Sequence, residues 1–222
     1  MIARSLRVYG SNFRVLIPYL LLFSAPVELL GNYPLDKGGM PQALFALFSA
    51  LLDMAANAVF LPAVFYALLH SLEGKRIPGM GDCLRWGTAR SARLFRWNLL
   101  YWLRVLFWSM VLVAPGLVVF LRYSLLPLVV ILEPERKNPM GRAREILRGR
   151  LGMFSAATTA LLFMPVAVST ALEVVLRYRF HLAGHWLLFS LCDFLTDLAI
   201  FPYAIMTLLA YRAWASEGEG WT

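Results

Sequence analysis

The residues with chemical potential in this sequence are a few charged and amide side chains inside long apolar stretches. Two of these stretches share the pattern D-x3-[N/D]-x4-P, which places Asp53 and Asn57 in one stretch and Asp193 and Asp197 in the other. A third stretch aligns with them and carries Arg122 at the position of Asn57 and Asp197. Residues four apart lie on one face of a helix, so the members of each pair should point in one direction.

These side chains are expected to meet in one buried cluster, because charged groups inside a membrane rarely face lipid. The expected members are Asp53, Asn57, Arg122, Asp193 and Asp197, with Arg104 as a candidate additional cation. One interpretation is a structural network, in which arginine bridges carboxylates and holds the helices in register. The other is a proton or ion site, because the carboxylates outnumber the arginines. Both interpretations stay open at this point.

The composition indicates which elements must position these residues. The chain has 222 residues, of which 60% are hydrophobic and only 15% are charged, and its mean hydropathy is +0.65. A soluble domain contains roughly 25% charged residues, so the sequence predicts an all-α polytopic membrane protein. A membrane span needs about 20 mostly apolar residues. The six predicted spans are residues 14–31, 43–70, 97–114, 116–133, 152–176 and 186–211.

The basic residues predict an orientation in the membrane. The 21 Lys and Arg residues outnumber the 13 Asp and Glu residues, and most of them lie in three clusters between apolar stretches. The three clusters and Arg212 fall on one predicted side, whereas the other side holds only Lys37, Arg177 and Arg179. Cytoplasmic loops are enriched in Lys and Arg. The sequence therefore predicts that both termini face the cytoplasm.

Each basic cluster is expected to form an amphipathic helix that lies on the membrane surface. The clusters are residues 2–14, 82–96 and 139–151. Each precedes a hairpin of two predicted spans, so the chain is interpreted as one integral membrane domain, residues 1–222, with three repeat units. These units cover residues about 1–73, 78–133 and 139–214.

The arginines of these helices are expected to bind anionic lipid headgroups or a cytoplasmic protein partner. They are Arg4, Arg7, Arg85, Arg93, Arg96, Arg142, Arg144 and Arg148. The alternative is that they only fix the topology and the position of the helices. Nucleic acid is not expected as a partner, because no aromatic stacking platform accompanies the charge.

The sequence contains no motif for catalysis or for a cofactor. Cys83 lies in a basic segment and Cys192 in an apolar stretch, so a disulfide between them is not expected. His181 and His185 are four residues apart but lack a compact third ligand for zinc. The sequence therefore predicts a protein that is not an enzyme and that uses no metal or cofactor.

Residues 115–154, PGLVVFLRYSLLPLVVILEPERKNPMGRAREILRGRLGMF, resemble a family of bacterial six-span membrane proteins. This family is related to the membrane domain of glycerophosphodiester phosphodiesterases. The corresponding residues are Pro115, Gly116, Arg122, Leu132, Glu133, Ala143 and Gly149. In fused members a separate soluble domain performs the phosphodiester chemistry. The resemblance thus implies a membrane-integral domain that handles lipids or assists an associated machine.

The function predicted from the sequence is that of an accessory or scaffold subunit of a membrane complex, in contact with anionic lipid or with a cytoplasmic partner. Two alternatives stay open. One is the membrane subunit of an exporter, in which residues 82–96 couple to a separate ATPase. The other is a proton-coupled carrier that uses the intramembrane Asp and Arg cluster.

Overall fold

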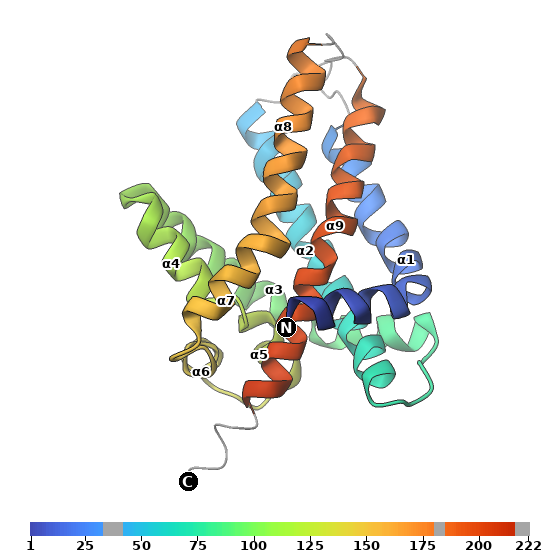
Figure 1. The fold of residues 1–222 in the computed structure, drawn as a ribbon, viewed down its shortest axis with the longest axis vertical. Helices are drawn as coiled ribbons and strands as arrows, with labels where there is room; N and C mark the ends of the chain where they lie inside the picture. Colours follow the sequence, from blue (N-terminus) through green and yellow to red (C-terminus); the bar gives the residue numbers. More distant parts are fainter. Residues whose placement is uncertain (33–41, 180–184, 216–222) are drawn as a thin grey trace.

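The computed structural model describes residues 1–32, 42–179 and 185–215, and these residues form helices and no strand (Figure 1). The helices are α1 (Ile2–Asn32), α2 (Gln42–Leu72), α3 (Met80–Val111), α4 (Val113–Tyr123), α5 (Leu126–Leu132), α6 (Pro139–Ile146), α7 (Leu151–Thr158), the π-helix η2 (Thr159–Phe163), α8 (Met164–Arg179) and α9 (Trp186–Ala215). Helices α7, η2 and α8 follow one another without a gap. The predicted all-α class is confirmed for the described part of the chain.

The two ends of the bundle differ in charge. The N-terminus, the α2–α3 connection, α6 and the C-terminal end of α9 lie together at the lower end in Figure 1. This end, called the basic end below, carries most of the Lys and Arg residues. Helices α1, α2, α8 and α9 extend from it to the opposite end, called the far end.

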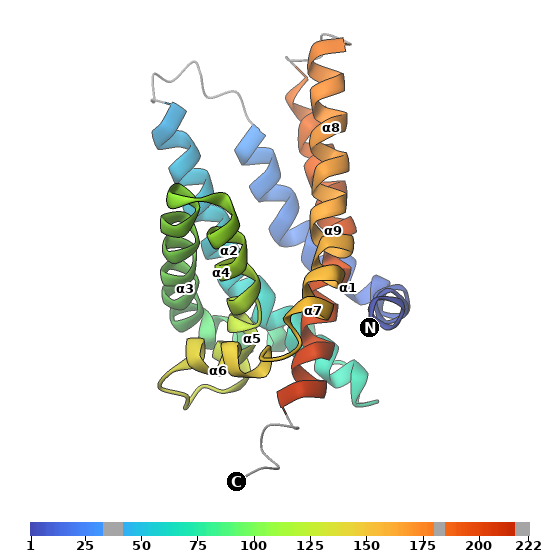
Figure 2. The same cartoon turned by 60° about the vertical axis from the view of Figure 1, so that its left-hand side comes forward.

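Among the described residues, five helical segments are long and apolar enough to cross a membrane, as expected for a multi-pass membrane protein. They are Ile2–Leu30, Leu47–Leu72, Val113–Leu132, Leu151–Leu176 and Trp186–Ala215. The third predicted span, 97–114, forms the second half of α3 and is not among them. At 1.5 Å per residue, residues 97–111 extend about 22 Å, less than the roughly 30 Å of a hydrocarbon core. The α3–α4 hairpin accordingly stops short of the far end (Figure 2).

Helix α1 begins with a segment that lies across the basic end and then turns to run along the other helices (Figures 1 and 2). Pro18 lies inside α1 and accounts for this bend, because proline lacks an N–H group and its ring displaces the preceding turn. Ser5 and Asn12 are buried against the bundle, whereas Leu6 and Phe13 are exposed. The first segment thus keeps an exposed apolar stripe, as expected for a helix on a membrane surface.

The second basic segment is not a separate helix. Residues 82–96 continue without interruption into the rest of α3. Only the third segment is distinct, because α6 ends after Ile146 and Gly149 adopts a φ of +76° before α7 begins. The prediction that a separate interfacial helix precedes each hairpin is therefore wrong for the first and second segments, which continue into the rest of α1 and of α3.

The helices are held most closely in the half of the bundle near the basic end, where the buried side chains of α2, α5 and α9 gather. Helix α2 packs on α3 at Gly87, where a Cβ atom would lie 2.6 Å from the carbonyl oxygen of Val59 and 3.3 Å from the Cβ of Ala63. Gly116 likewise allows α4 to approach Ser109 of α3. Most side chains of α8 are instead exposed. The far half is therefore the less tightly packed part.

We expect Gly87→Ala to lower the free energy of unfolding in detergent by roughly 1–3 kcal/mol, because the added methyl group overlaps the α2 backbone. Gly81→Ala is the matched control, because Gly81 lies in the same helix with open space around its Cβ position. This second change should leave stability unchanged or raise it slightly. Thermal unfolding followed by circular dichroism compares the two variants. Equal melting temperatures would contradict the close contact between α2 and α3.

Candidate functional site

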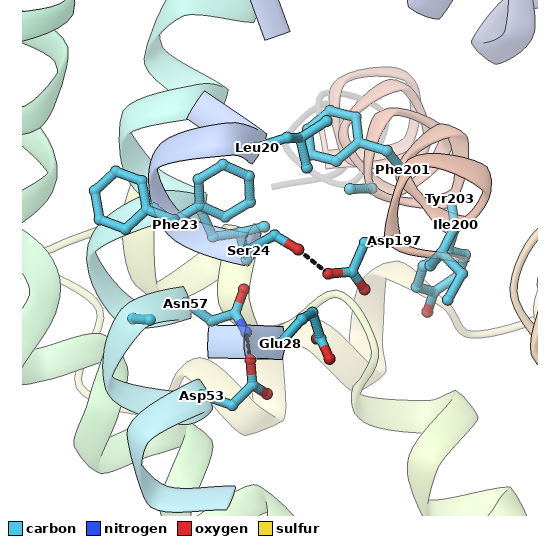
Figure 3. Close-up of a pocket in the computed structure, with 14 residues that line it drawn as sticks. Leu20, Phe23, Ser24, Glu28, Asp53, Asn57, Asp197, Ile200, Phe201 and Tyr203 are labelled. Carbon is cyan, nitrogen blue, oxygen red and sulfur yellow. Dashed lines mark hydrogen bonds between the residues drawn. The ribbon is translucent and has the colours of Figure 1, made fainter. Parts of the chain in front are cut away.

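A cavity of about 260 Å³ lies between α1, α2 and α9, from the middle of the bundle toward the far end (Figure 3). Its polar walls are Ser24 and Glu28 of α1, Asp53 and Asn57 of α2, and Asp197 of α9. Figure 3 shows the carboxyl groups of Glu28, Asp53 and Asp197 directed toward the same space. The structure thus brings together three of the predicted residues, Asp53, Asn57 and Asp197.

The third predicted carboxyl group, that of Asp193, belongs to the same cluster. The carboxyl group of Glu28 lies near those of Asp193, Asp53 and Asp197. On α2, Asn57 Nδ2 donates a hydrogen bond to Asp53 Oδ1 at 2.7 Å. The spacing of four residues therefore places the members of both predicted pairs near the same cavity.

Ser24 and Glu28 were not among the predicted residues. The hydroxyl group of Ser24 donates a hydrogen bond to Asp197 Oδ2, which joins α1 to α9. Ser24 and Glu28 are themselves four residues apart, so they lie on one face of α1. This is the same spacing as in the other two pairs, and it is the sequence signal that could have identified them.

Neither predicted arginine reaches this cluster. Arg122 is exposed on α4 and lines a different cavity, beside α6. Arg104 is exposed on α3, where its guanidinium group donates to the sulfur of Met140 at 3.4 Å and lies 5.8 Å from the centre of the Tyr123 ring. The predicted Asp and Arg cluster is therefore wrong in its cations. The physical reason is that α4 packs mainly on α3, α6 and α7, so the aligned position faces away from α1 and α9.

The remaining walls of the cavity are mostly aromatic and aliphatic, and no described lining residue is basic. The ring centres of Phe23 and Phe60 are 5.6 Å apart, and those of Phe60 and Phe201 are 6.1 Å apart. Carboxyl groups and aromatic faces thus share one space without a positive side chain. Both kinds of group attract cations.

The carboxyl groups are too dispersed for a metal centre. Within residues 1–32, 42–179 and 185–215, no group of three or more His, Cys, Asp or Glu side chains could hold a metal ion. The pair of histidines considered from the sequence includes His181, which lies outside the described residues. The cavity therefore suits protons or an organic cation better than a metal ion held by several carboxylates.

Tyr203 connects the cavity to two irregular places in the helices. It lines the cavity from α9, and its hydroxyl group contacts those of Ser124 and Thr158. Ser124 lies at the break between α4 and α5, and Thr158 immediately precedes η2. Single π-helical turns inside α-helices occur frequently at functional sites. The cavity is therefore in contact, through one side chain, with both irregularities.

No protein-family model, curated protein or solved structure matches this chain. The resemblance of residues 115–154 to six-span proteins related to a phosphodiesterase membrane domain has no support from these comparisons and stays a prediction. The function must therefore be inferred from the geometry of the site itself.

A second polar network joins α5, α6 and α9 at the basic end. Arg142 is only 5% exposed, and its guanidinium group donates to Glu133 at 3.4 Å, to Glu145 at 3.4 Å and to the carbonyl oxygen of Ala215 at 3.2 Å. Glu133 also accepts a hydrogen bond from the Tyr211 hydroxyl group at 2.8 Å. Burial lowers the pKa of Arg142, but the two carboxylates outweigh it and raise the pKa overall. The prediction that Arg142 contacts lipid or a protein partner is therefore wrong, because its guanidinium group is buried among Glu133, Glu145 and the carbonyl group of Ala215.

The other arginines predicted to contact lipid or a partner remain nearer the surface. Arg4, Arg7, Arg85, Arg96, Arg144 and Arg148 are exposed, and Arg93 is half-buried. Arg85 pairs with Asp82 at 2.9 Å, and Arg93 donates to the carbonyl oxygen of Arg136 at 2.7 Å. Their role in binding stays a prediction.

We expect Arg142→Gln to lower the free energy of unfolding by about 3 kcal/mol, because it leaves Glu133 half-buried with one of its cations removed. Lys137→Gln removes the same charge from an exposed side chain at the same end and should change stability by less than about 0.5 kcal/mol. Chemical denaturation in detergent measures both. If the two variants were equally stable, the Arg142 network would not hold α5, α6 and α9 together.

Proposed function

We propose that the protein is a proton-coupled membrane carrier for a small organic cation. The observation that supports this function is one cavity that is lined by Glu28, Asp53 and Asp197 and whose described walls contain no basic residue. Asp193 lies beside Glu28. Ionisable residues inside membrane spans are costly, and they commonly mark substrate or proton pathways.

The charge balance argues against a purely structural network. Such a network requires arginine to neutralise the carboxylates, and both Arg104 and Arg122 lie elsewhere. Asn57 and Ser24 donate hydrogen bonds to carboxyl groups of the cluster but add no positive charge. Transferring an ionised carboxylate from water to an apolar medium costs several kcal/mol of desolvation free energy. The cluster is therefore expected to hold protons, a cationic ligand or both in turn.

The walls of the cavity favour an organic cation. Phe23, Phe60 and Phe201 offer aromatic faces, which attract an ammonium group within about 6 Å of the ring centre. The volume of about 260 Å³ lies near the lower limit of roughly 300 Å³ for small-molecule sites. The ligand is therefore expected to be small and compact.

A neighbouring cavity offers an access route. It has a volume of about 270 Å³, lies between α1 and α2, and shares Glu28 and Asp53 with the acidic cavity. Its other walls are mainly apolar and include Leu30, Phe48 and Leu52. A cation with an apolar body can pass such a surface while its charge approaches the shared carboxyl groups.

Proton coupling follows from competition for the same carboxyl groups. A carboxyl group that holds a proton cannot at the same time neutralise a bound cation. Cation binding therefore releases protons from Glu28 of α1, Asp53 of α2, or Asp193 and Asp197 of α9, and protonation releases the cation. This exchange is the elementary step of an antiporter.

The basic end faces the cytoplasm of a bacterial cell in this carrier, because cytoplasmic loops are enriched in Lys and Arg. Met1 and the C-terminal end of α9 lie at this end. The apolar half of α3 serves as a sixth, shorter membrane segment beside α4. The acidic cavity then lies toward the opposite side of the inner membrane.

Uptake of radiolabelled tetraethylammonium into proteoliposomes with an imposed pH gradient tests the proposal. The wild-type protein is expected to accumulate the probe when the lumen is acidic. Asp197→Asn should lower this uptake at least about tenfold, equivalent to about 1.4 kcal/mol, because it removes a negative charge and keeps an acceptor for Ser24.

Asp82→Asn is the control for this measurement. Asp82 lies at the start of α3, is exposed and pairs with Arg85 at 2.9 Å, so its replacement should leave uptake unchanged. Melting temperatures of both variants verify that they are folded. Uptake that persists in Asp197→Asn, or that is absent from the wild-type protein, would rule out this carrier.

An accessory or scaffold subunit is the second candidate function, and the α3–α4 hairpin favours it. Near the tip of this hairpin, Phe107, Met110 and Val113 are 64%, 81% and 79% exposed. The tip stops short of the far end (Figure 2), so these side chains form an apolar surface inside the membrane. Another membrane subunit could cover this surface.

Extraction in mild detergent, followed by mass spectrometry of the proteins that co-purify, tests the second candidate. An accessory subunit should co-purify with a membrane protein partner in stoichiometric amount. Met110→Glu at the exposed tip should abolish this co-purification without lowering the yield of the chain. A stoichiometric ATPase would make the chain an exporter subunit coupled through residues 82–96. Isolation of the chain alone would contradict both forms of this candidate.

A further inference from the structure

A second charged cavity lies at the basic end, between the end of α4 and the turn from α6 to α7. Its volume is about 570 Å³. Arg122 borders it from α4, and Arg144 and Arg148 border it from the α6–α7 segment. Leu147 and Leu151 add apolar walls. Two separate segments of the chain thus present three guanidinium groups to one partly apolar space.

These three arginines differ from Arg142, which pairs with two carboxylates. In the part of the chain that the structure describes, none of them makes an ion pair or a side-chain hydrogen bond. Glu145 also borders the cavity, but it pairs with Arg142 at 3.4 Å. The cavity therefore carries a net positive charge and has donors available for an anion.

The surface around the cavity is that of helices in contact with lipid. Arg122 lies within an apolar segment long enough to span a membrane, whereas the other two arginines lie outside such segments. Toward the far end, Leu117 and Val118 of α4 and Met153 of α7 are exposed. Helices α4 and α8 diverge above them in both views (Figures 1 and 2). The cavity therefore joins a basic site to an apolar surface.

We propose that this cavity binds the phosphate group of an anionic phospholipid, with the acyl chains along α4 and α7. Guanidinium groups donate paired hydrogen bonds to phosphate oxygens. Arg144 lies near the end of α6 and Arg148 in the turn that follows, and both can approach the phosphate, while Arg122 extends toward it from the apolar segment. This site shares no lining residue with the acidic cavity and does not depend on the proposed carrier function.

Native mass spectrometry of the full chain tests this site. The protein is delipidated in detergent and then exposed to equimolar phosphatidylglycerol and phosphatidylcholine. The wild-type protein should retain phosphatidylglycerol preferentially. Arg122→Gln should lower its retention about fivefold, because each basic residue near an anionic headgroup contributes about 1 kcal/mol. Replacing Arg122 and Arg148 together by Gln should abolish the preference.

Arg85→Gln is the matched control, because it removes the same charge from an exposed arginine that does not line this cavity. It should retain the wild-type preference, and all variants should keep the wild-type melting temperature. Competition with millimolar inorganic phosphate separates a lipid headgroup from a free anion, and the lipid is expected to stay bound. Displacement by inorganic phosphate, unchanged retention in Arg122→Gln, or equal loss in Arg85→Gln would each overturn the proposal.

Discussion

The carboxyl groups that gather between α1, α2 and α9 are the constraint on which the rest of this structure depends. Glu28, Asp53, Asp193 and Asp197 lie on three helices that could each cross a membrane, and their mutual repulsion disfavours close packing at that level. The bundle is held instead by its apolar core near the basic end, where Gly87 allows α2 and α3 to touch. The closely packed half near the basic end therefore stabilises the bundle more than the half near the far end does.

The two ends of the bundle treat carboxyl groups differently. Glu28, Asp53, Asp193 and Asp197 gather away from the basic end, whereas Glu133 and Glu145 at the basic end pair with Arg142 and bury it. A buried ion pair is weak evidence for stability by itself, but removing one partner is costly. The Arg142 network thus fixes how α5, α6 and α9 meet and leaves the neighbouring arginines available to the surroundings.

Local spacing in the sequence predicted part of the site because helical periodicity is a local property. The pairs Asp53 and Asn57, and Asp193 and Asp197, share a helix face whatever the helix packs against. The position of Arg122 depends on long-range packing, since α4 ends at Tyr123 and packs mainly on α3, α6 and α7. No spacing rule contains that information. The burial of an arginine in α6 likewise depends on α9, which lies far away in the sequence.

The proposed carrier function requires the cavity to open to the two sides of the membrane in turn, and this requires helices that bend at defined places. Two such places meet at Tyr203: the break after Ser124 and the π-helix that follows Thr158. Pro165 lies shortly after this π-helix and leaves another backbone carbonyl without its helical donor. Because Tyr203 also lines the acidic cavity, neutralising the carboxyl groups changes the field around the side chain that contacts both bends. The acidic cavity and the two irregular places in the helices thus have Tyr203 as a common neighbour.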